Sequence, residues 1–277
     1  MRPSADPSLG GLRRGFRLLA ALAIAGSLIA LAWQLLDKGF GGSGPPPPPL
    51  VTATFADGLA GWSAAGVGEV LPQVLPGPGL GGQPAARFLL EGEENRSELI
   101  FGGDGGTGVT GIREFSEGDE YWYGFAFYVG QMVWGHPGSQ NLIMQLKSEG
   151  TGAPNLGLQL WDWRGEGGAP GGRGLWSEGA AMSVDGDEHR FLAPVAERQW
   201  HQVQVHFRAS SAERGSYEVF LDGTLVDAAS GVSTIVPGRR SAYIKDGIYR
   251  DGAVIPGTSE LWLLGGKLGE SRQSVEF

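Results

Sequence analysis

From residue 50 onward, apolar and polar residues alternate in short runs, and this pattern limits the chain to folds built from strands. In the run YWYGFAFYV, residues 121–129, every second side chain is aromatic or aliphatic, as in a strand that buries one face. An Asp-Gly pair at 222–223 predicts a hairpin. No stretch of ten or more residues after residue 50 has a helical period. Similar alternation recurs in the runs 141–147, 155–163, 200–207, 217–226 and 259–266.

Glycine is the residue that separates these runs. The chain has 49 glycines in 277 residues without a G-x-y period, which excludes collagen and indicates tight turns between short strands. Apolar residues make up 41% of the chain, with 9 Trp and 12 Phe, enough for a sizeable core. We therefore predict an all-β domain over residues 51–277, a sandwich of two antiparallel sheets with one concave face.

The N-terminal part reads as a membrane or export segment. Residues 1–17 form a basic flank, and residues 18–36 are apolar or small except for Ser27 and Gln34, a length that can span a bilayer. An uncleaved transmembrane anchor fits this length, whereas a cleaved signal fits the twin arginines. Residues 37–50 form a Gly/Pro-rich linker. Both alternatives predict an exported body, membrane-anchored outside the cytoplasm or secreted after cleavage.

The charge of the body restricts its partners. Residues 1–50 carry five basic and two acidic residues, a net of +3, so the remainder carries −9 − 3 = −12. An acidic body argues against nucleic acid as a partner. An anionic substrate would need a local cationic site, because distant charges are screened beyond about 10 Å. With no cysteine, disulfides and thiolate metal sites are excluded.

The predicted solvent-facing sides of several strands combine amides, cations and aromatic rings. Gln145 and Lys147 share one such side, and Trp161 and Trp163 share another. The stretch YIKDGIYR, residues 243–250, places Tyr243, Lys245 and Tyr249 on one face, with Gly247 leaving room between them. Aromatic faces beside hydrogen-bonding groups suit sugar rings, which have apolar faces edged by hydroxyls.

Three stretches carry a resemblance to a known family. RSEL (96–99), QLK (145–147) and YIKDGIYR (243–250) resemble, in this order, the three signature strands of the jelly-roll polysaccharide lyases, which include alginate, glucuronan and heparin-lyase-like enzymes. The resemblance covers roughly residues 51–265. It implies a concanavalin-like jelly roll with a concave substrate face. It also implies β-elimination at a uronic acid of an anionic polysaccharide.

The resemblance also implies roles for individual residues. Removal of the proton at carbon 5 builds negative charge on the uronate carboxylate, which Arg96 and Gln145 would neutralise. In the family, the second tyrosine of the third motif is the acid and often also the base, and here that residue is Tyr249. A free phenol has a pKa near 10, so a tyrosine base needs nearby cations, here Lys245 and Arg96. Glu98 would orient Arg96. The remaining candidates for substrate binding are Lys147, Tyr243, His136, Asn141 and Trp161.

One position departs from the family pattern. Where the second motif usually ends in histidine, this chain has Lys147, which can neutralise a carboxylate but needs a lowered pKa to act as a base. We therefore expect Tyr249 to serve as both base and acid. That is simplest when the proton and the leaving group lie on the same ring face, as in glucuronate or mannuronate. His136, in the loop WGHPGSQN, is a possible replacement base.

Two other functions compete with a lyase. A non-catalytic carbohydrate-binding module can share this fold. A glycoside hydrolase needs two carboxylates roughly 5 to 10 Å apart, and closely spaced strand acids of the E-x-D-x-E kind are absent from the sequence. We predict a monomer without a cofactor. The acidic stretches 117–120 and 185–188 read equally well as calcium ligands or as turns.

Overall fold

The computed structural model describes residues 45–64, 70–103, 113–136, 138–148, 152–163, 171–179 and 189–277. The predicted anchor or signal segment, residues 18–36, lies outside these ranges. Among the residues that the structure does describe, no helix has both the length and the apolar character needed to cross a membrane. Residues 46–277 form one compact body.

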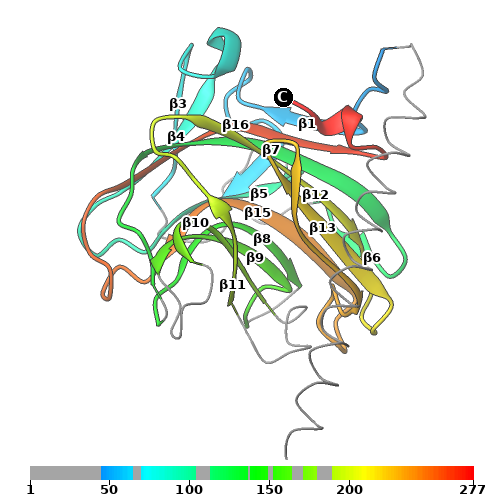
Figure 1. Ribbon diagram of the computed structural model, residues 1–277. Helices are drawn as coiled ribbons and strands as arrows, with labels where there is room; N and C mark the ends of the chain where they lie inside the picture. The colour runs from blue at the N-terminus through cyan, green and yellow to red at the C-terminus, as the bar shows by residue number, and fades with distance from the viewer. Residues whose placement is uncertain are drawn as a thin grey trace, which may run out of the picture. The chain divides into compact units, whose positions relative to one another are not determined.

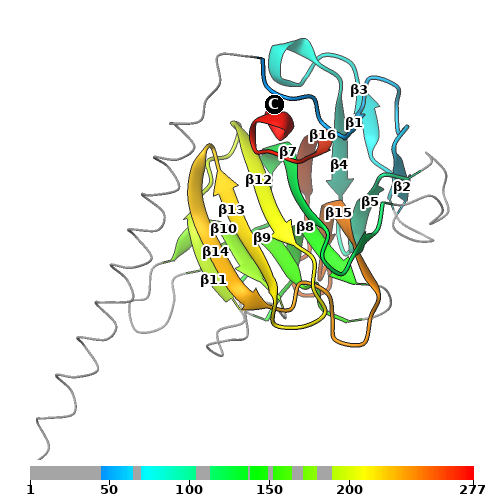
Figure 2. The ribbon, with the colours of Figure 1, turned by 90° about the vertical axis from the view of Figure 1, so that its right-hand side faces the viewer.

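The described body consists of two eight-stranded sheets, one over the other in Figure 1 and seen from the side in Figure 2. We call them sheet A and sheet B. Sheet A has the order β14-β13-β12-β7-β16-β4-β3, with β1 also paired to β16. Its strands are β1 (Val51–Thr54), β3 (Gln73–Leu75), β4 (Ala85–Leu90), β7 (Glu120–Gln131), β12 (Trp200–Arg208), β13 (Gly215–Leu221), β14 (Thr224–Val232) and β16 (Ser259–Gly269).

Sheet B has the order β11-β10-β9-β8-β15-β5-β2, with β6 also paired to β15. Its strands are β2 (Trp62–Ala64), β5 (Arg96–Phe101), β6 (Phe115–Ser116), β8 (Asn141–Ser148), β9 (Leu156–Trp163), β10 (Gly172–Glu178), β11 (His189–Pro194) and β15 (Ser241–Arg250). The strand pairs of both sheets are antiparallel. Two short 3-10 turns, η2 (Leu80–Gly82) and η5 (Gln273–Val275), complete the described elements.

Alternation along the strands builds the core between the sheets. On β7, Phe125, Phe127 and Val129 point into the sandwich, and on β9 Leu158 and Leu160 meet them from the other sheet. Burying these apolar faces is the main force that holds the sheets together. The prediction of an all-β sandwich of two antiparallel sheets is confirmed.

The predicted hairpin at 222–223 is also present, between β13 and β14. Asp222 and Gly223 have positive φ angles of 49° and 81°. Two successive residues in this region are what a two-residue turn of type I′ requires, and its twist matches that of the flanking strands.

Candidate active site

The three sequence motifs form three neighbouring strands in sheet B. β15 carries YIKDGIYR and lies between β5, which carries RSEL, and β8, which carries QLK. In this register Tyr249 lies opposite Arg96, Lys245 opposite Gln145, and Tyr243 opposite Lys147. Ile244 and Ile248 of the same strand belong to the core between the sheets. Because side chains alternate along a strand, the motif side chains lie on the outer face of sheet B.

Glu98 joins the members of this cluster. Its Oε1 accepts a hydrogen bond from Nε2 of Gln145. Its Oε2 lies 3.2 Å from Nε of Arg96 and 3.7 Å from Nζ of Lys245. One carboxylate therefore fixes the positions of an amide and two cations that come from three different strands.

The floor of the cluster is buried. Glu98 and Gln145 are each 2% exposed and Lys245 is 5% exposed. Hydrogen bonds to a charged group are stronger and shorter than neutral ones, and burial reduces screening by water. Arg96 is more accessible, with 31% of its side chain exposed. The arrangement offers a cationic surface to a carboxylate although the body as a whole is acidic.

The two tyrosines lie at opposite ends of the β15 motif. Cζ of Arg96 is 4.0 Å from the centre of the Tyr249 ring, in a cation–π contact. Tyr243 is instead paired with Lys147 across the β15–β8 ladder. Both phenol side chains are partly exposed. Tyr249 is thus the phenol next to the Arg96–Glu98–Gln145 group.

Lys147 lies at the edge of the same group of charges. Its pKa is lowered from the usual 10.5, first by burial and then by the positive charges of Lys245 and Arg96, while Glu98 opposes the shift. Its Nζ donates a hydrogen bond to the carbonyl of Gly152. Lys147 therefore adds a positive charge to the group, and it loses its proton more readily than an exposed lysine does.

Three predicted substrate-binding residues lie elsewhere. His136 is exposed in the segment between β7 and β8, where its backbone N–H donates to Oγ of Ser139. Asn141 is fully buried, and its Nδ2 donates to the carbonyls of Val133 and Leu160 at 3.0 and 2.9 Å.

Trp161 is also fully buried. Because neither its ring nor the amide of Asn141 is accessible, the expectation that these two residues contact a sugar is corrected to a structural role.

Gly247 has a different role from the predicted one. Its φ is +139°, and a Cβ built there would lie 2.2 Å from the carbonyl oxygen of Ser97 and 2.9 Å from Cε1 of Phe88. The register of β15 against β8 shifts between Asp246 and Tyr249. Glycine is needed because the backbone approaches β5 closely at this bulge, and not because it leaves space between side chains on the outer face.

Two charged residues of β15 were not among the predicted site residues. Asp246 is fully buried and accepts a hydrogen bond from the hydroxyl of Tyr123 on sheet A. Arg250 is fully buried, and its guanidinium donates to three backbone carbonyls and one serine hydroxyl. Both share the inner side of the strand with Ile244 and Ile248, as the alternation of YIKDGIYR predicts. A charged residue there signals a buried polar network, which supports the strand from below.

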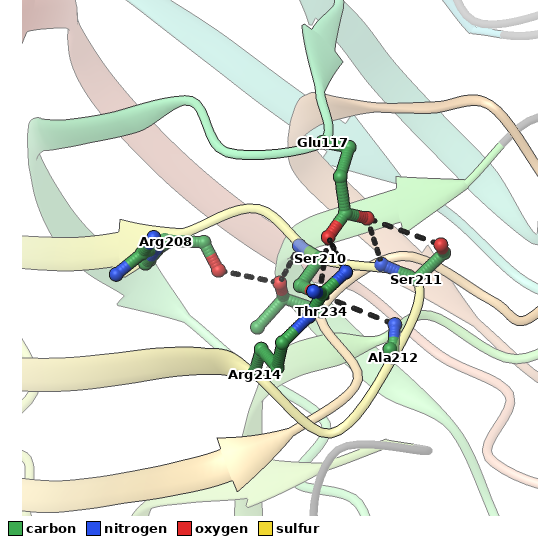
Figure 3. Close-up of polar contacts among 7 residues, drawn as sticks. All are labelled: Glu117, Arg208, Ser210, Ser211, Ala212, Arg214 and Thr234. Atoms are coloured by element: carbon green, nitrogen blue, oxygen red, sulfur yellow. Dashed lines mark hydrogen bonds and ion pairs between the residues drawn. The ribbon is translucent and has the colours of Figure 1, made fainter.

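The structure gives no support to calcium at residues 117–120. The carboxylate of Glu117 accepts hydrogen bonds from Ser210 and Ser211 and pairs with Arg214, as Figure 3 shows. Oδ2 of Asp119 accepts the backbone N–H of Ser116. Within the described residues, no group of three or more His, Asp or Glu side chains is placed to hold a metal. The second acidic stretch, 185–188, lies outside these residues.

Comparisons with known proteins agree with this geometry. Residues 71–264 match the family model described as "Polysaccharide lyase". An endo-β-1,4-glucuronan lyase from the fungus Trichoderma reesei has a similar fold, with a TM-score of 0.59 and 18% identity over 81% of this chain and 96% of that one. Alginate lyase Aly36B gives a TM-score of 0.54 and 12% identity over 81% and 98% of the two chains.

An alginate lyase from Chlorella virus gives a TM-score of 0.52 and 8% identity over 80% of this chain and all of that one. A search of curated protein sequences found no match. At these identities the structures establish the fold, while the family model, which spans most of the described body, establishes the family. The chain therefore belongs to the polysaccharide lyase family.

Proposed function

We propose that this enzyme cleaves a uronic-acid polysaccharide by β-elimination, with Tyr249 as both base and acid. The observation that carries the proposal is the Arg96–Glu98–Gln145–Lys245 cluster beside Tyr249, in a chain of the polysaccharide lyase family. Related folds that act on glucuronan and alginate support a uronate substrate.

In the proposed reaction, the Tyr249 oxygen takes the proton from carbon 5 of the uronate. The bond between carbon 4 and the glycosidic oxygen then breaks, and a double bond forms between carbons 4 and 5. The proton held by Tyr249 passes to the leaving oxygen, so the enzyme ends the cycle unchanged. One residue can do both steps when the proton and the leaving group are on the same ring face, which favours glucuronate or mannuronate.

The cluster suits the charge that this reaction creates. As the carbon 5 proton leaves, negative charge moves onto the substrate carboxylate, and fixed donors placed there lower the barrier. We assign this role to Arg96 and Gln145, both of which contact Glu98. Arg96 also lies over the Tyr249 ring, so a cation is next to the group that moves the proton. Lys245, Lys147 and Tyr243 would bind the neighbouring parts of the substrate.

A product assay tests the function. The full chain is incubated with polyglucuronate, polymannuronate, polyguluronate and hyaluronan, and the ultraviolet absorbance of the unsaturated uronate is followed. We expect absorbance with polyglucuronate or polymannuronate, and little with polyguluronate. Reducing ends without absorbance would identify a hydrolase, and binding without either product would identify a carbohydrate-binding module.

A pair of matched variants tests the role of Tyr249. Tyr249→Phe removes the proton-carrying oxygen and is expected to lower kcat by about 10³-fold or more. Tyr243→Phe makes the same chemical change on the same strand, away from Arg96, and is expected to change KM by less than about 10-fold. If Tyr243→Phe abolished turnover and Tyr249→Phe did not, the assignment would be reversed.

We also propose that the enzyme acts outside the cytoplasm. The support is the sequence alone: a basic flank followed by the apolar residues 18–36 and a Gly/Pro-rich linker. Added protease should digest the body in cells whose cytoplasmic proteins stay intact. Protection of the body together with those proteins would reject this location.

A further inference from the structure

A row of aromatic side chains crosses the outer face of sheet A, on the side of the sandwich away from the cluster described above. Trp200 on β12 is paired with Tyr128 on β7, and Tyr128 is paired with Trp262 on β16. These three strands are neighbours in sheet A (Figure 1). Since adjacent strands lie about 4.8 Å apart, the row spans about 10 Å.

The rings of this row point away from the core. The residues that flank Tyr128 and Trp262 in the chain belong to the core between the sheets, which places the rings themselves on the opposite face. All three rings are only partly buried. Trp200 and Trp262 rest on a small apolar cluster of Ala85, Ala126 and Leu264. The centres of the Tyr128 and Trp200 rings are 5.6 Å apart, at an angle of 47°.

The row lines a cleft of about 610 Å³. That volume is within the range of about 300 to 1,000 Å³ typical of small-molecule sites. Gly130 follows the row on β7, and a Cβ there would lie 2.6 Å from Oε2 of Glu260. Because this residue is glycine, the Glu260 side chain can lie across the strand beside the rings.

Polar groups edge the cleft. Gln131 and Arg198 line it and are exposed. The backbone N–H of Arg198, at a positive φ of 60°, donates to the carbonyl of Val129 at 2.8 Å, which fixes the turn before Trp200 against β7. An amide and a guanidinium at the edge of a ring surface are donors of the kind that sugar hydroxyls and carboxylates accept.

The two carboxylates of the cleft are paired with arginines. Oε1 of Glu260 lies 2.5 Å from Nε of Arg87. Oε1 of Glu197 lies 3.5 Å from Arg173. Arg173 also lies 3.2 Å from Oδ2 of Asp162, so that, with Arg198, these groups sum to three positive and three negative charges, a net of zero. The cleft therefore does not share the strongly acidic character of the body and does not repel a polyanion.

We propose that this cleft is a second, non-catalytic polysaccharide-binding site that stacks pyranose rings on the Trp200–Tyr128–Trp262 row. Sugar rings have apolar faces that pack on aromatic rings and equatorial hydroxyls that need donors at the rim, and the cleft provides both. The site is on the sheet opposite the signature strands, so one polymer could be held on sheet A while a neighbouring segment or chain is cleaved at sheet B. Such a second contact raises the effective concentration of a long substrate without changing the chemistry.

Binding of the full chain to immobilised polymers tests this site. The double variant Trp200→Ala/Trp262→Ala is compared with Trp122→Ala, a change of the same kind on the same face of sheet A, where Trp122 stacks on His206 instead. The arms are polyglucuronate and polymannuronate for acidic polymers, and a β-1,4-glucan and a xylan for neutral ones. The acidic and neutral arms show whether the stacked pyranose belongs to a uronan or to a neutral chain.

We expect the double variant to lose about 10-fold or more in affinity for at least one polymer, since each stacked ring contributes roughly a factor of a few to tenfold. Turnover of a soluble tetrasaccharide should stay within about twofold of the unaltered chain, a readout that separates this site from the catalytic one. Trp122→Ala should leave both binding and turnover unchanged. If the chain binds no polymer in any arm, or the double variant binds as well as the unaltered chain, the site does not exist.

A second pair of variants guards against loss of folding. Gln131→Ala and Arg198→Gly alter exposed residues, and glycine accepts the positive φ of residue 198 without strain. Each should lower the affinity for the same polymer by about threefold or more, while the circular dichroism spectrum and Tm stay unchanged. Unchanged affinity in both would overturn the proposal even if the tryptophan variants failed to fold.

Discussion

At the scale of single residues, the central member of the cluster is the carboxylate of Glu98, to which we assign no proton transfer. Glu98 is almost fully buried and engages the amide of Gln145 and the cations Arg96 and Lys245. Without this anion, the cations would repel one another and the amide would lose its acceptor. We therefore propose that Glu98 positions Arg96, Gln145 and Lys245 for the substrate carboxylate.

Glu98→Gln tests this positioning role. Glutamine keeps the size of the side chain but removes the negative charge, so Arg96 and Lys245 lose their ion-pair partner. We expect kcat to fall by about 10- to 100-fold, because small misplacements of binding groups cost rate. KM for an acidic polymer should not rise, since the cluster becomes one unit more positive.

The matched control is Glu93→Gln, which removes the same charge from an exposed turn between β4 and β5. Steady-state kinetics of the two variants, side by side, provide the measurement. A kcat for Glu98→Gln within twofold of the unaltered enzyme would show that Glu98 is dispensable for positioning.

At the scale of elements, the sequence predicts the direction in which side chains point better than their depth. Alternation placed the motif side chains on the outer face of sheet B, as observed. It could not show that Gly135, between β7 and β8, runs beside β9 through backbone hydrogen bonds with Leu160 and Asp162. Gly135 forms a bridge with Trp161, and a Cβ there would lie 2.3 Å from Cδ1 of that ring. A segment brought in by the tertiary fold thus buries a tryptophan that its own strand would expose.

Register is the other property that the pattern does not contain. The bulge between Asp246 and Tyr249 decides which residues of β8 and β15 face one another. The motifs themselves, by contrast, were sufficient to predict that three distant segments come together. The motif residues can be recognised within the sequence of a single strand. Bulges and covering segments depend on contacts between elements, which the sequence of one strand does not contain.

A loop contact provides a prediction at this scale. The turn before β7 is tied to the loop between β12 and β13 through Glu117 (Figure 3). The pKa of Glu117 is lowered from 4.5 to about 2, chiefly by the backbone N–H of Ser211 and then by the hydroxyl of Ser210, with Arg214 also contributing. A lowered pKa means that the charged form stabilises the fold above pH 4.5, and that this stabilisation is lost as the pH falls towards 2.

Glu117→Gln should therefore lower Tm at pH 7 and have little effect near pH 2. Thermal unfolding followed by circular dichroism at several pH values measures the difference. Glu213→Gln, in the same loop between β12 and β13 and exposed, is the control and should leave Tm unchanged at each pH. An equal loss of Tm at pH 7 and near pH 2 for Glu117→Gln would contradict the pKa assignment.

At the scale of the whole body, one buried polar contact connects the two sheets directly beneath the motif cluster. Tyr123 of sheet A donates its hydroxyl hydrogen bond to Asp246 of sheet B. Burial raises the pKa of Asp246 from 3.8 to about 8, with a smaller contribution from the charge of Glu98, while the hydrogen bond from Tyr123 opposes the shift. At pH 7 the protonated carboxyl predominates, so the core is spared a buried negative charge.

Asp246→Asn tests how this group couples to the stability of the body. A raised pKa in the folded state means that stability is fully present below about pH 3.8, falls as the pH rises, and reaches its lower limit above about pH 8. For one group, the slope within this window is at most about 1.4 kcal/mol per pH unit. Asparagine stays neutral and can still accept the hydrogen bond from Tyr123.

The free energy of unfolding of Asp246→Asn minus that of the unaltered chain should therefore become more positive as the pH rises from 4 to 8, because only the unaltered chain loses stability. Denaturant titrations at pH 4, 6 and 8 measure it, with Asp57→Asn, an exposed position, as the control that should follow the unaltered chain. Curves that stay parallel for Asp246→Asn across this range would show that the carboxyl is already ionised in the folded body. The contact between the sheets would then be a buried anion that the hydrogen bond from Tyr123 stabilises.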